Sequence, residues 1–267
     1  MLPLKEPLTE LQDRVINDMY DAELAYEDHL LRHLFHYLDE PEVRDNTLVI
    51  LTSDHGEGLN HHNFVGHSLV VYDDLIRVPL IVRYPPLYPE SKHVTTLVST
   101  RRVFHSALEA AGIYSVRNDS DGKEGAPVDV EGLSLARSLD KADPEKGIVF
   151  CEAYTPETLV ALMEDDDPEF VKTYRWRSMR RAVCRENHKL ITVGDEPDEL
   201  FDVIHDPGEL DNLIRKEPVM VAELEGLLVD LRFEAEARRP DRWKAARLRF
   251  EEDEELAKRL RGLGYLG

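Results

Sequence analysis

The stretch Thr47–Pro85 constrains the fold of this chain more than any other part of the sequence. It opens with a short apolar, β-branched run, Thr47–Thr52, which is typical of a strand buried on both faces, as in a parallel sheet. A polar cluster, Ser53–Glu57, follows at once, and a second apolar run, Val78–Val82, predicts the next strand. Because ligands bind at the carboxyl ends of strands in open α/β sheets, we expect the chemistry of this protein at the polar cluster.

Asp54 and His55 are the candidate metal ligands of this cluster. A hard carboxylate beside an imidazole suits a divalent metal ion. Gly56 and Gly58 allow the backbone to turn sharply behind the pair. The alternative is that Asp54 and His55 form a hydrogen-bonded structural couple without a metal.

The same stretch closely resembles the sulfatase family of the alkaline-phosphatase-like superfamily. Sequences of that family carry a strand, then SDHGE or SDNGE, an EHG-like turn, GH or GK, and a YEE-like element that leads into RVPLI. This chain has the corresponding elements in the same order and spacing, at Ser53–Glu57, Asn60–Asn63, Gly66–His67, Tyr72–Asp74 and Arg77–Ile81. A lone Asp-His-Gly would be a weak signal, but five elements in register make a strong one.

The resemblance implies an α/β fold, the alkaline-phosphatase-like three-layer sandwich, of which this chain supplies the C-terminal part. A small antiparallel C-terminal subdomain and a helical tail are expected to follow. We therefore place residues 1–147 in the sandwich core and residues 148–267 in an antiparallel-sheet subdomain with terminal helices.

Residues 9–39 predict a long amphipathic helix. Thr9 and Gln12 form a capping box at its start, and Pro41 ends it. Its sequence resembles the YDAEIAYVD helix that precedes the metal strand in the family, so we expect it to cover a core. An apolar stripe recurs at intervals of three and four residues, at Leu11, Val15, Met19, Ala22, Tyr26, Leu30, Leu34 and Leu38.

The second half of the chain predicts short antiparallel strands and a helix. Another helix, Val103–Ala111, comes earlier and stops at Gly112. The segment around Asp206–Pro207 resembles the family element ELYDLxxDPxExxNL, whose role we expect to be structural. Expected strands are Ile148–Tyr154, Met179–Cys184, Lys189–Val193 and Glu199–Phe201, and expected helices are Pro218–Arg238 and, in the charged tail, Glu251–Arg261.

The remaining histidines and the cysteines favour structural interpretations. His29, His33 and His36 are spaced by four and three residues, which places them along an exposed flank of the first helix. Cys151 and Cys184 each lie in an apolar, strand-like context and predict buried thiols. Two cysteines do not make a disulfide scaffold.

Roles for two loop histidines follow from the resemblance. His67 falls where sulfatase-like enzymes place a His or Lys that contacts the sulfuryl oxygens or the leaving group, so it is the candidate catalytic and substrate-binding residue. His62 matches the EHG histidine and is a second candidate for substrate binding, although Asn60 and Asn63 depart from the family pattern. The alternative for His67 is an ordinary loop residue. Arg77 is expected to pair with a neighbouring aspartate and not with substrate.

The resemblance also implies a divalent metal held by Asp54 and His55. Calcium or magnesium is the first expectation. Manganese or zinc is admitted as well, because imidazole is a softer donor than the amide oxygen of the asparagine that often stands there in the family.

The family's nucleophile motif is absent from the sequence given. Sulfatases use the first residue of C-x-P-S-R or S-x-P-S-R, whereas Cys151 precedes Glu-Ala-Tyr and Cys184 precedes Arg-Glu-Asn. The resemblance therefore implies a metal-dependent hydrolase of sulfate esters that lacks its nucleophile half and is inactive alone. Alternatives are a phosphodiesterase or phosphonate hydrolase of the same superfamily, or an inactive fragment or subunit. A separate nucleophile-bearing N-terminal half is the expected protein partner.

Composition narrows the remaining partners. With 54 acidic and 33 basic residues the formal net charge is -21, which disfavours nucleic acid and anionic membranes. The expected substrate, a small-molecule or glycan sulfate ester, is also an anion, so its site must be locally positive. Residues 1–10 show no signal-peptide pattern, and no apolar run approaches a membrane span. The chain as given is expected in the cytoplasm, and the location of a longer form is left open.

Overall fold

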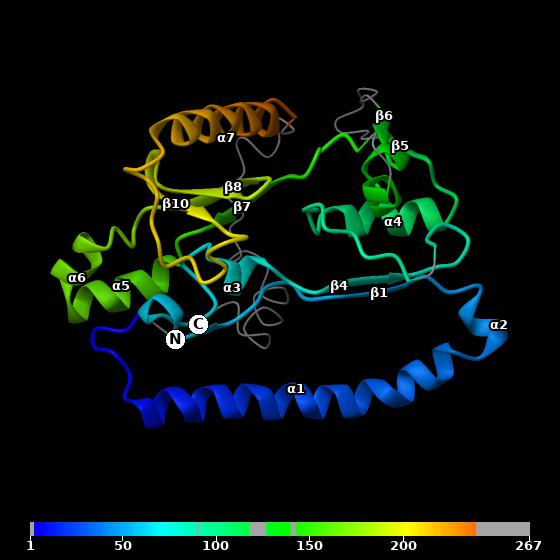
Figure 1. Cartoon of the computed structure of the whole chain (residues 1–267), viewed down its shortest axis with the longest axis horizontal. Coiled ribbons are helices and arrows are strands. Elements are labelled where there is room, and N and C mark those ends of the chain that lie inside the picture. Colours follow the sequence, from blue (N-terminus) through cyan, green and yellow to red (C-terminus); the bar gives the residue numbers. More distant parts are fainter. Residues whose placement is uncertain (1–2, 90, 118–126, 140–142, 239–267) are drawn as a thin grey trace, which may run out of the picture.

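The computed structural model describes residues 3–89, 91–117, 127–139 and 143–238. In Figure 1 helix α1 runs along one edge of the molecule and the strand pair β1–β4 lies above it. The four-stranded sheet and helix α7 lie at the opposite edge, with α4 beside them. Residues 53–79, which carry the candidate site, join β1 to β4, and Val71 of this segment packs against the C-terminal sheet.

Helix α1, Glu10–Leu38, begins at the predicted capping box. The Gln12 N–H donates to the Thr9 hydroxyl at 3.3 Å, and the Thr9 N–H donates to the Gln12 side chain at 2.9 Å. The short helix α2, Pro41–Arg44, follows with proline at its first position. The predicted long helix is confirmed, and the three histidines on its flank are exposed as expected.

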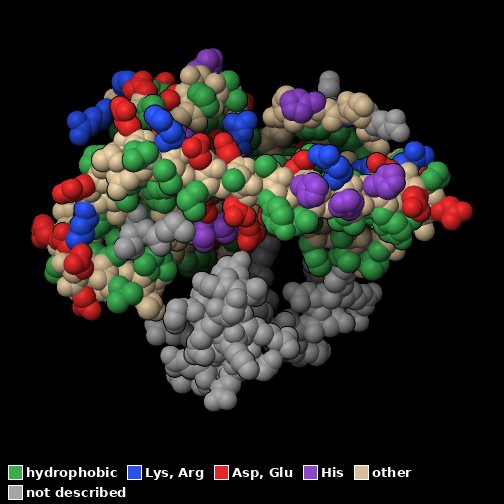
Figure 2. All heavy atoms as spheres, turned by 90° about the horizontal axis from the view of Figure 1, so that it is seen from below, with side chains coloured by type: hydrophobic (Ala, Val, Ile, Leu, Met, Phe, Trp, Pro, Cys, Tyr) green, Lys and Arg blue, Asp and Glu red, His purple; other side chains and the backbone are tan. Residues whose placement is uncertain are grey.

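The apolar stripe of α1 does not cover a core in the part of the chain that the structure describes, so that prediction is wrong. Two contacts hold the helix, one on its other flank and one at its C-terminal end. On the flank, Asn60 Nδ2 donates to Asp13 Oδ1 at 2.8 Å. At the end, Arg83 donates to the Leu38 carbonyl, also at 2.8 Å. From the α1 side, Figure 2 shows hydrophobic side chains lying open among acidic groups and histidines. Large stripe residues are 46% to 68% exposed, namely Leu11, Val15, Met19, Tyr26, Leu30 and Leu34.

Strand β1, Val49–Thr52, pairs with β4, Leu80–Arg83, in antiparallel register, with Ile50 opposite Val82. The prediction of a parallel strand buried on both faces is therefore wrong. Residues 53–79 lead the chain back alongside β1, which allows an antiparallel pair without a crossover helix. Within the described residues the pair forms a two-stranded sheet, and its strands remain only partly covered.

Three short elements lie between these strands. β2, Gly58–Leu59, pairs with β3, Val65–Gly66, and the helix α3, Asp73–Ile76, precedes β4. The turn joining β2 to β3 contains Asn60, His62 and Asn63 at positive φ angles of 81°, 56° and 53°. Asparagine tolerates this left-handed conformation better than most residues, which accounts for two of the three.

Helix α4, Arg102–Ala110, ends two residues before Gly112, whose φ of +75° suits glycine. The strand pair β5, Ser115–Arg117, and β6, Pro127–Asp129, follows it. Arg102 is fully buried, and its two terminal nitrogens bind the Asp143 carboxylate at 2.6 and 3.1 Å. This bidentate pair ties α4 to the segment that leads into the C-terminal sheet.

The C-terminal sheet is antiparallel, in the order β10-β9-β8-β7, and confirms the four predicted strands. Helix α7 covers it, because Leu224 and Leu228 pack against Val183, Leu190 and Leu200. The elements are β7, Ile148–Ala153, β8, Arg180–Arg185, β9, His188–Val193, β10, Glu196–Asp202, and α7, Pro218–Arg238.

Two helices in the second half of the chain were not predicted. They are α5, Glu157–Asp166, and α6, Pro168–Thr173. Asp167 caps α6 by accepting a hydrogen bond from the Phe170 N–H at 3.0 Å. The acidic composition of this stretch hides the apolar positions Val160, Met163 and Val171, which are buried.

The two predicted parts of the chain share a core. Val71 packs with Ile191 and Phe201 in one cluster of buried residues. The antiparallel sheet begins at Ile148, next to the expected boundary, and the division into two units stays a prediction. The expected helix Glu251–Arg261 lies outside the described residues.

Candidate metal and catalytic site

The candidate site lies in the loop that leaves β1. Ser53 Oγ donates to the His55 carbonyl at 2.6 Å, and the His55 N–H donates to Asp54 Oδ1 at 3.0 Å. The Asp54 side chain is 67% exposed, and its Oδ2 lies 3.7 Å from His55 Nε2. The loop therefore presents one carboxylate and one imidazole at the end of β1, as the sequence predicts.

Gly56 allows this loop to approach α3 closely. Its N–H donates to the Leu75 carbonyl at 2.8 Å, and a Cβ atom at position 56 would lie 1.9 Å from the Asp74 carbonyl oxygen. Backbone cannot yield to such a contact, so only glycine fits here. The glycine serves close packing, in addition to the turn that the sequence suggests.

His55, Glu57 and His67 form a cluster whose ligand atoms all lie within 4.8 Å of one another. The rings of His55 and His67 stack with centroids 4.4 Å apart and an angle of 22° between planes. β2 and β3 bring His67 back to the loop, because Gly58 pairs with Gly66 immediately before it. The structure thus joins two predicted site residues, His55 and His67, and adds Glu57.

Hydrogen bonds fix the tautomers of both rings. His55 Nδ1 lies 2.8 Å from the Gly56 carbonyl, and His67 Nδ1 lies 2.8 Å from Glu57 Oε2. Carbonyl and carboxylate oxygens only accept, so both Nδ1 atoms carry the proton. In the neutral form of each ring, Nε2 then carries the lone pair that a metal or a proton can take.

The donor set fits a divalent metal. Two imidazoles and a carboxylate make up the cluster, and the second carboxylate, Asp54, adjoins His55. Sets of two histidines and one carboxylate bind zinc in catalytic sites. Imidazole nitrogen is a softer donor than the all-oxygen shells that calcium and magnesium prefer. The assignment of Asp54 and His55 as ligands stays a prediction.

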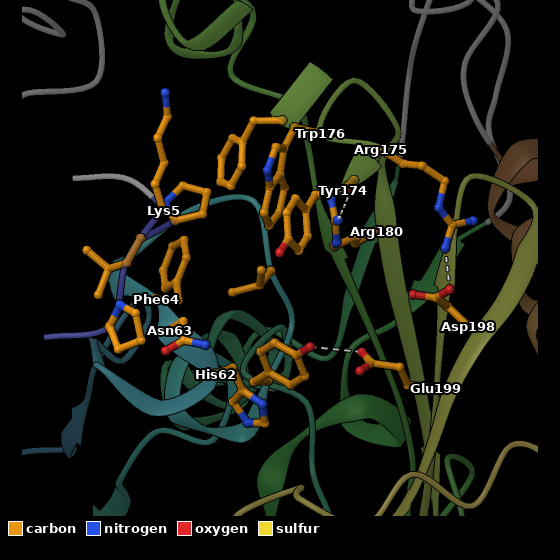
Figure 3. A pocket seen from close by; sticks show the side chains of 16 residues that line it. Lys5, His62, Asn63, Phe64, Tyr174, Arg175, Trp176, Arg180, Asp198 and Glu199 are labelled. Atoms are coloured by element: carbon orange, nitrogen blue, oxygen red, sulfur yellow. Dashed lines mark hydrogen bonds and ion pairs between the residues drawn. The ribbon is translucent and has the colours of Figure 1, made fainter. Parts of the chain in front are cut away.

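His62 lies apart from this cluster. Its ring stacks on Tyr72 with centroids 3.7 Å apart, and burial lowers its pKa despite the opposing charge of Asp74. The Tyr72 hydroxyl donates to Glu199 Oε2 at 2.9 Å, and burial raises the pKa of Tyr72. His62, Tyr72 and Glu199 line a pocket of about 330 Å³ (Figure 3). The expected substrate-binding role of His62 stays a prediction, and its position is beside the C-terminal sheet.

Acidic partners hold the residues that flank the site. His61 Nδ1 lies 2.7 Å from Asp74 Oδ2, and Arg77 Nη1 lies 3.7 Å from Asp73 Oδ2, as expected for Arg77. The two cysteines are free thiols, and burial raises the pKa of both. Neither cysteine is therefore presented as a ready thiolate.

Glu57 is the cluster residue to which sequence reasoning gave no role. The sequence does place Glu57 in the polar run that holds the candidate ligands, two positions after His55. The missing information was the return of His67 to this loop, which depends on the pairing of β2 with β3.

Comparison with known proteins gives one consistent result. Residues 8–113 match the family model described as Sulfatase. The arylsulfatase K of Xenopus laevis is 26% identical over 220 residues, which cover 82% of this chain and 37% of that protein. A Δ4,5-hexuronate-2-O-sulfatase of Bacteroides thetaiotaomicron is 28% identical over 189 residues, or 69% of this chain and 34% of that protein. The chain thus spans little more than a third of the length of these relatives.

Solved structures share the fold. One, determined in complex with its substrate D-glucosamine-2-N,6-O-disulfate, aligns with a TM-score of 0.58 at 22% identity, over 80% of this chain and 40% of that chain. The phosphonate monoester hydrolase of Agrobacterium radiobacter aligns with a TM-score of 0.57 at 21% identity, over 78% and 39%. These matches confirm the alkaline-phosphatase-like fold class. In the described part of the chain, no helix has both the length and the apolar character needed to cross a membrane.

Proposed function

Since this chain belongs to the sulfatase family of the alkaline-phosphatase-like superfamily, we propose that it supplies the metal-binding part of a sulfuric ester hydrolase. The observation that carries the proposal is the cluster of His55, Glu57 and His67 in the segment that follows β1. Their ligand atoms lie within 4.8 Å of one another. Imidazole and carboxylate groups so close together suit metal-assisted cleavage of an ester.

In this proposal Asp54 and His55 hold the metal, through a carboxylate oxygen and Nε2. The Gly56 carbonyl keeps the His55 ring in the tautomer that a ligand needs. When bound, the metal would polarise a sulfuryl oxygen and offset its charge. The imidazole favours manganese or zinc, and the exposed carboxylate also admits calcium or magnesium.

His67 is proposed as the catalytic residue. Glu57 accepts the Nδ1 proton of His67 and so fixes the ring. With a second proton on Nε2, His67 would donate to a sulfuryl oxygen or to the leaving oxygen. Removing one such donor costs about 3 kcal/mol of transition-state stabilisation in enzymes where it has been measured.

A sugar sulfate is the substrate class that we propose. Its support is the resemblance to a hexuronate sulfatase and the fold shared with a protein bound to a disulfated glucosamine. The polar loop of Ser53, Asp54 and His55 is open to solvent on the side of Asp54, which leaves room for a bulky alcohol group.

The partner that we propose is a nucleophile-bearing segment that covers the apolar stripe of α1. Stripe residues such as Met19 and Leu30 are 65% and 51% exposed. Full burial of a large apolar side chain is worth about 1.5–3 kcal/mol, so a stripe of this length is a strong docking surface. Such a segment would supply the attacking group, which makes the chain inactive by itself.

A phosphonate or phosphodiester hydrolase is the second candidate. Its support is the fold shared with a phosphonate monoester hydrolase and the same Asp-His pair. A metal with a nearby imidazole serves either anion, so the two functions differ only in the substrate turned over. Parallel assays of aryl sulfates and aryl phosphonates on the completed enzyme would decide between them.

Metal binding is the direct test of the site. We expect calorimetric titration with Mn²⁺ and Zn²⁺ to give one site, weakened roughly tenfold or more in Asp54→Ala and His55→Ala. His61→Gln, which lies outside the cluster, is the matched control and should bind as the wild type does. Binding that is unchanged in Asp54→Ala would reject the ligand assignment. Equal losses in His67→Gln and His55→Ala would make His67 a ligand and remove its catalytic role.

A further inference from the structure

Helix α7 is apolar on two opposite faces. The inner face packs against the C-terminal sheet, where Leu224 is fully buried and Leu228 is 3% exposed. The opposite face is open, since Val219 is 72%, Val229 55% and Phe233 75% exposed. At about 100° per residue, its members lie within an arc of about 80° opposite Leu224. This outer face of α7 consists of Val219, Ala222, Gly226, Val229 and Phe233.

The outer face has the pattern of a helix-packing surface. Its members repeat at intervals of three, four, three and four residues, which is the repeat along which two helices pack side by side. In Figure 1 α7 lies at the edge of the molecule, with the C-terminal sheet below it. A second helix can therefore lie along the outer face without displacing the sheet.

Acidic side chains flank the outer face. α7 holds five acidic and two basic residues, and Glu225 and Asp230 lie on opposite sides of the outer face, about 60–80° from its centre. Of the basic residues, Arg232 already binds Asp195 at 2.7 Å. A second copy of α7 would bring like charges together, so the charge favours a basic helix as the occupant.

The sequence after α7 contains such a basic segment. Residues 239–267 lie outside the described part of the chain, and within them residues 241–250 include four basic residues and one acidic residue. Trp243, Ala246 and Phe250 recur at intervals of three and four, so a helix would carry them on one face. Arg242 and Lys244 would then lie on either side of that face. Residues 251–255 are all acidic and do not suit the same position beside α7.

The connection has the right length for a return alongside α7. Only Arg239 and Pro240 separate α7 from this segment, and two antiparallel helices are joined by loops of about 2–5 residues. The proline disfavours continuation of α7, because it lacks an N–H and clashes with the preceding turn. Ten helical residues span about 15 Å, which reaches from the end of α7 back to Val229 but not to Val219.

We propose that residues 241–250 form a basic helix that folds back antiparallel to α7 and covers the C-terminal half of its outer face. Trp243 and Phe250 pack against Phe233 and Val229, and the basic side chains face the acidic flanks of α7. The small side chain of Ala246 leaves room for Phe233. The proposal concerns the assembly of the C-terminal sheet and is independent of the hydrolytic function proposed above.

The reactivity of an introduced thiol tests the proposal in the full chain. The Val229→Cys thiol should react with a water-soluble maleimide roughly tenfold or more slowly than it does in a chain that also carries Trp243→Ser and Phe250→Ser. The native thiols should contribute little, because burial raises the pKa of both Cys151 and Cys184. Equal rates in the two chains would show that the outer face is open and would overturn the proposal.

Further variants identify the occupant. Val219→Cys lies on the same face but beyond the reach of residues 241–250, so its rate should differ by less than about twofold between the two chains. Arg242→Glu with Lys244→Glu should remove most of the protection at Val229→Cys, because the acidic flanks of α7 would repel the segment. Equal protection at Val219→Cys, or protection that survives this charge reversal, would contradict the assignment. Protection that falls on dilution, with a dimer in size-exclusion chromatography, would make a second copy the occupant and overturn the proposal.

Discussion

Lys189→Met is expected to lower the free energy of unfolding by about 3–5 kcal/mol. Lys189 is fully buried, and its Nζ lies 2.8 Å from Asp73 Oδ1 and 2.5 Å from Glu209 Oε1. Glu209 also accepts from the Asp73 N–H at 2.6 Å, so one network joins β9, the loop after β10 and the start of α3. The substitution removes the buried cation that joins Asp73 and Glu209, and it leaves Asp73 with only the longer 3.7 Å contact to Arg77.

The magnitude follows from the geometry. At 2.8 Å and an effective dielectric constant of 20, one such pair is worth about 6 kcal/mol before the cost of burial. Burial alone would lower the pKa of Lys189, but the Glu209 and Asp73 carboxylates raise it, so the charged form is retained. The substitution removes this attraction and leaves the Asp73 and Glu209 carboxylates to repel each other. The free energy of unfolding therefore falls by several kcal/mol.

Urea unfolding followed by circular dichroism measures this cost. Lys172→Met is the matched control, because Lys172 is exposed and lies 3.6 Å from Glu169, and its change should stay within about 0.5 kcal/mol. The double variant Lys189→Met/Glu209→Gln should recover part of the loss, since it removes one of the stranded charges. A loss below about 1 kcal/mol in Lys189→Met would refute the reasoning.

Three further predictions test the loop, the pH dependence and the partner surface. Gly56→Ala should destabilise the chain by about 1–3 kcal/mol and weaken metal binding, because the Cβ of the alanine meets the Asp74 carbonyl. Thermal unfolding measures the first effect and metal titration the second. Burial lowers the pKa of His62 in the folded state, so the unfolded state takes up a proton more readily. The free energy of unfolding should therefore fall as the pH drops below the ordinary histidine pKa of about 6.5. In His62→Phe the urea midpoint should depend less on pH, and an unchanged pH dependence would contradict the role given to His62. Met19→Glu should leave the stability of the isolated chain within about 0.5 kcal/mol but abolish rescue by a co-expressed nucleophile-bearing segment.

Local signals in the sequence were sufficient for several elements. The capping box at Thr9 and Gln12 predicts where α1 begins, and its periodicity predicts the whole helix. The four strands of the C-terminal sheet were predicted from short apolar runs. In contrast, the strand run at 47–52 shows its β character but not its partner, because apolar composition does not encode strand direction.

The exposed stripe of α1 could not be predicted from the chain. Periodicity shows that one face is apolar, and it says nothing about what lies over that face. The stripe is open because the described residues contact α1 mainly through its opposite flank and its end.

The candidate metal site could be predicted only in part, because local sequence does not show which separate segments come into contact. Asp54 and His55 adjoin in the sequence, and the family resemblance pointed to His67. Glu57 gained its role only through the turn that brings His67 beside it. The pocket beside His62 could not be predicted, because His62, Trp176 and Glu199 come from segments far apart in the sequence.

Hydrolysis of an aryl sulfate, with and without a co-expressed nucleophile-bearing segment of a related sulfatase, tests the central claim most directly. We expect no turnover above the buffer blank for this chain alone. For the completed enzyme we expect metal-dependent turnover, lost in Asp54→Ala and reduced roughly 100-fold or more in His67→Ala. Metal-dependent turnover by the purified chain alone, absent in its Asp54→Ala variant, would contradict the claim.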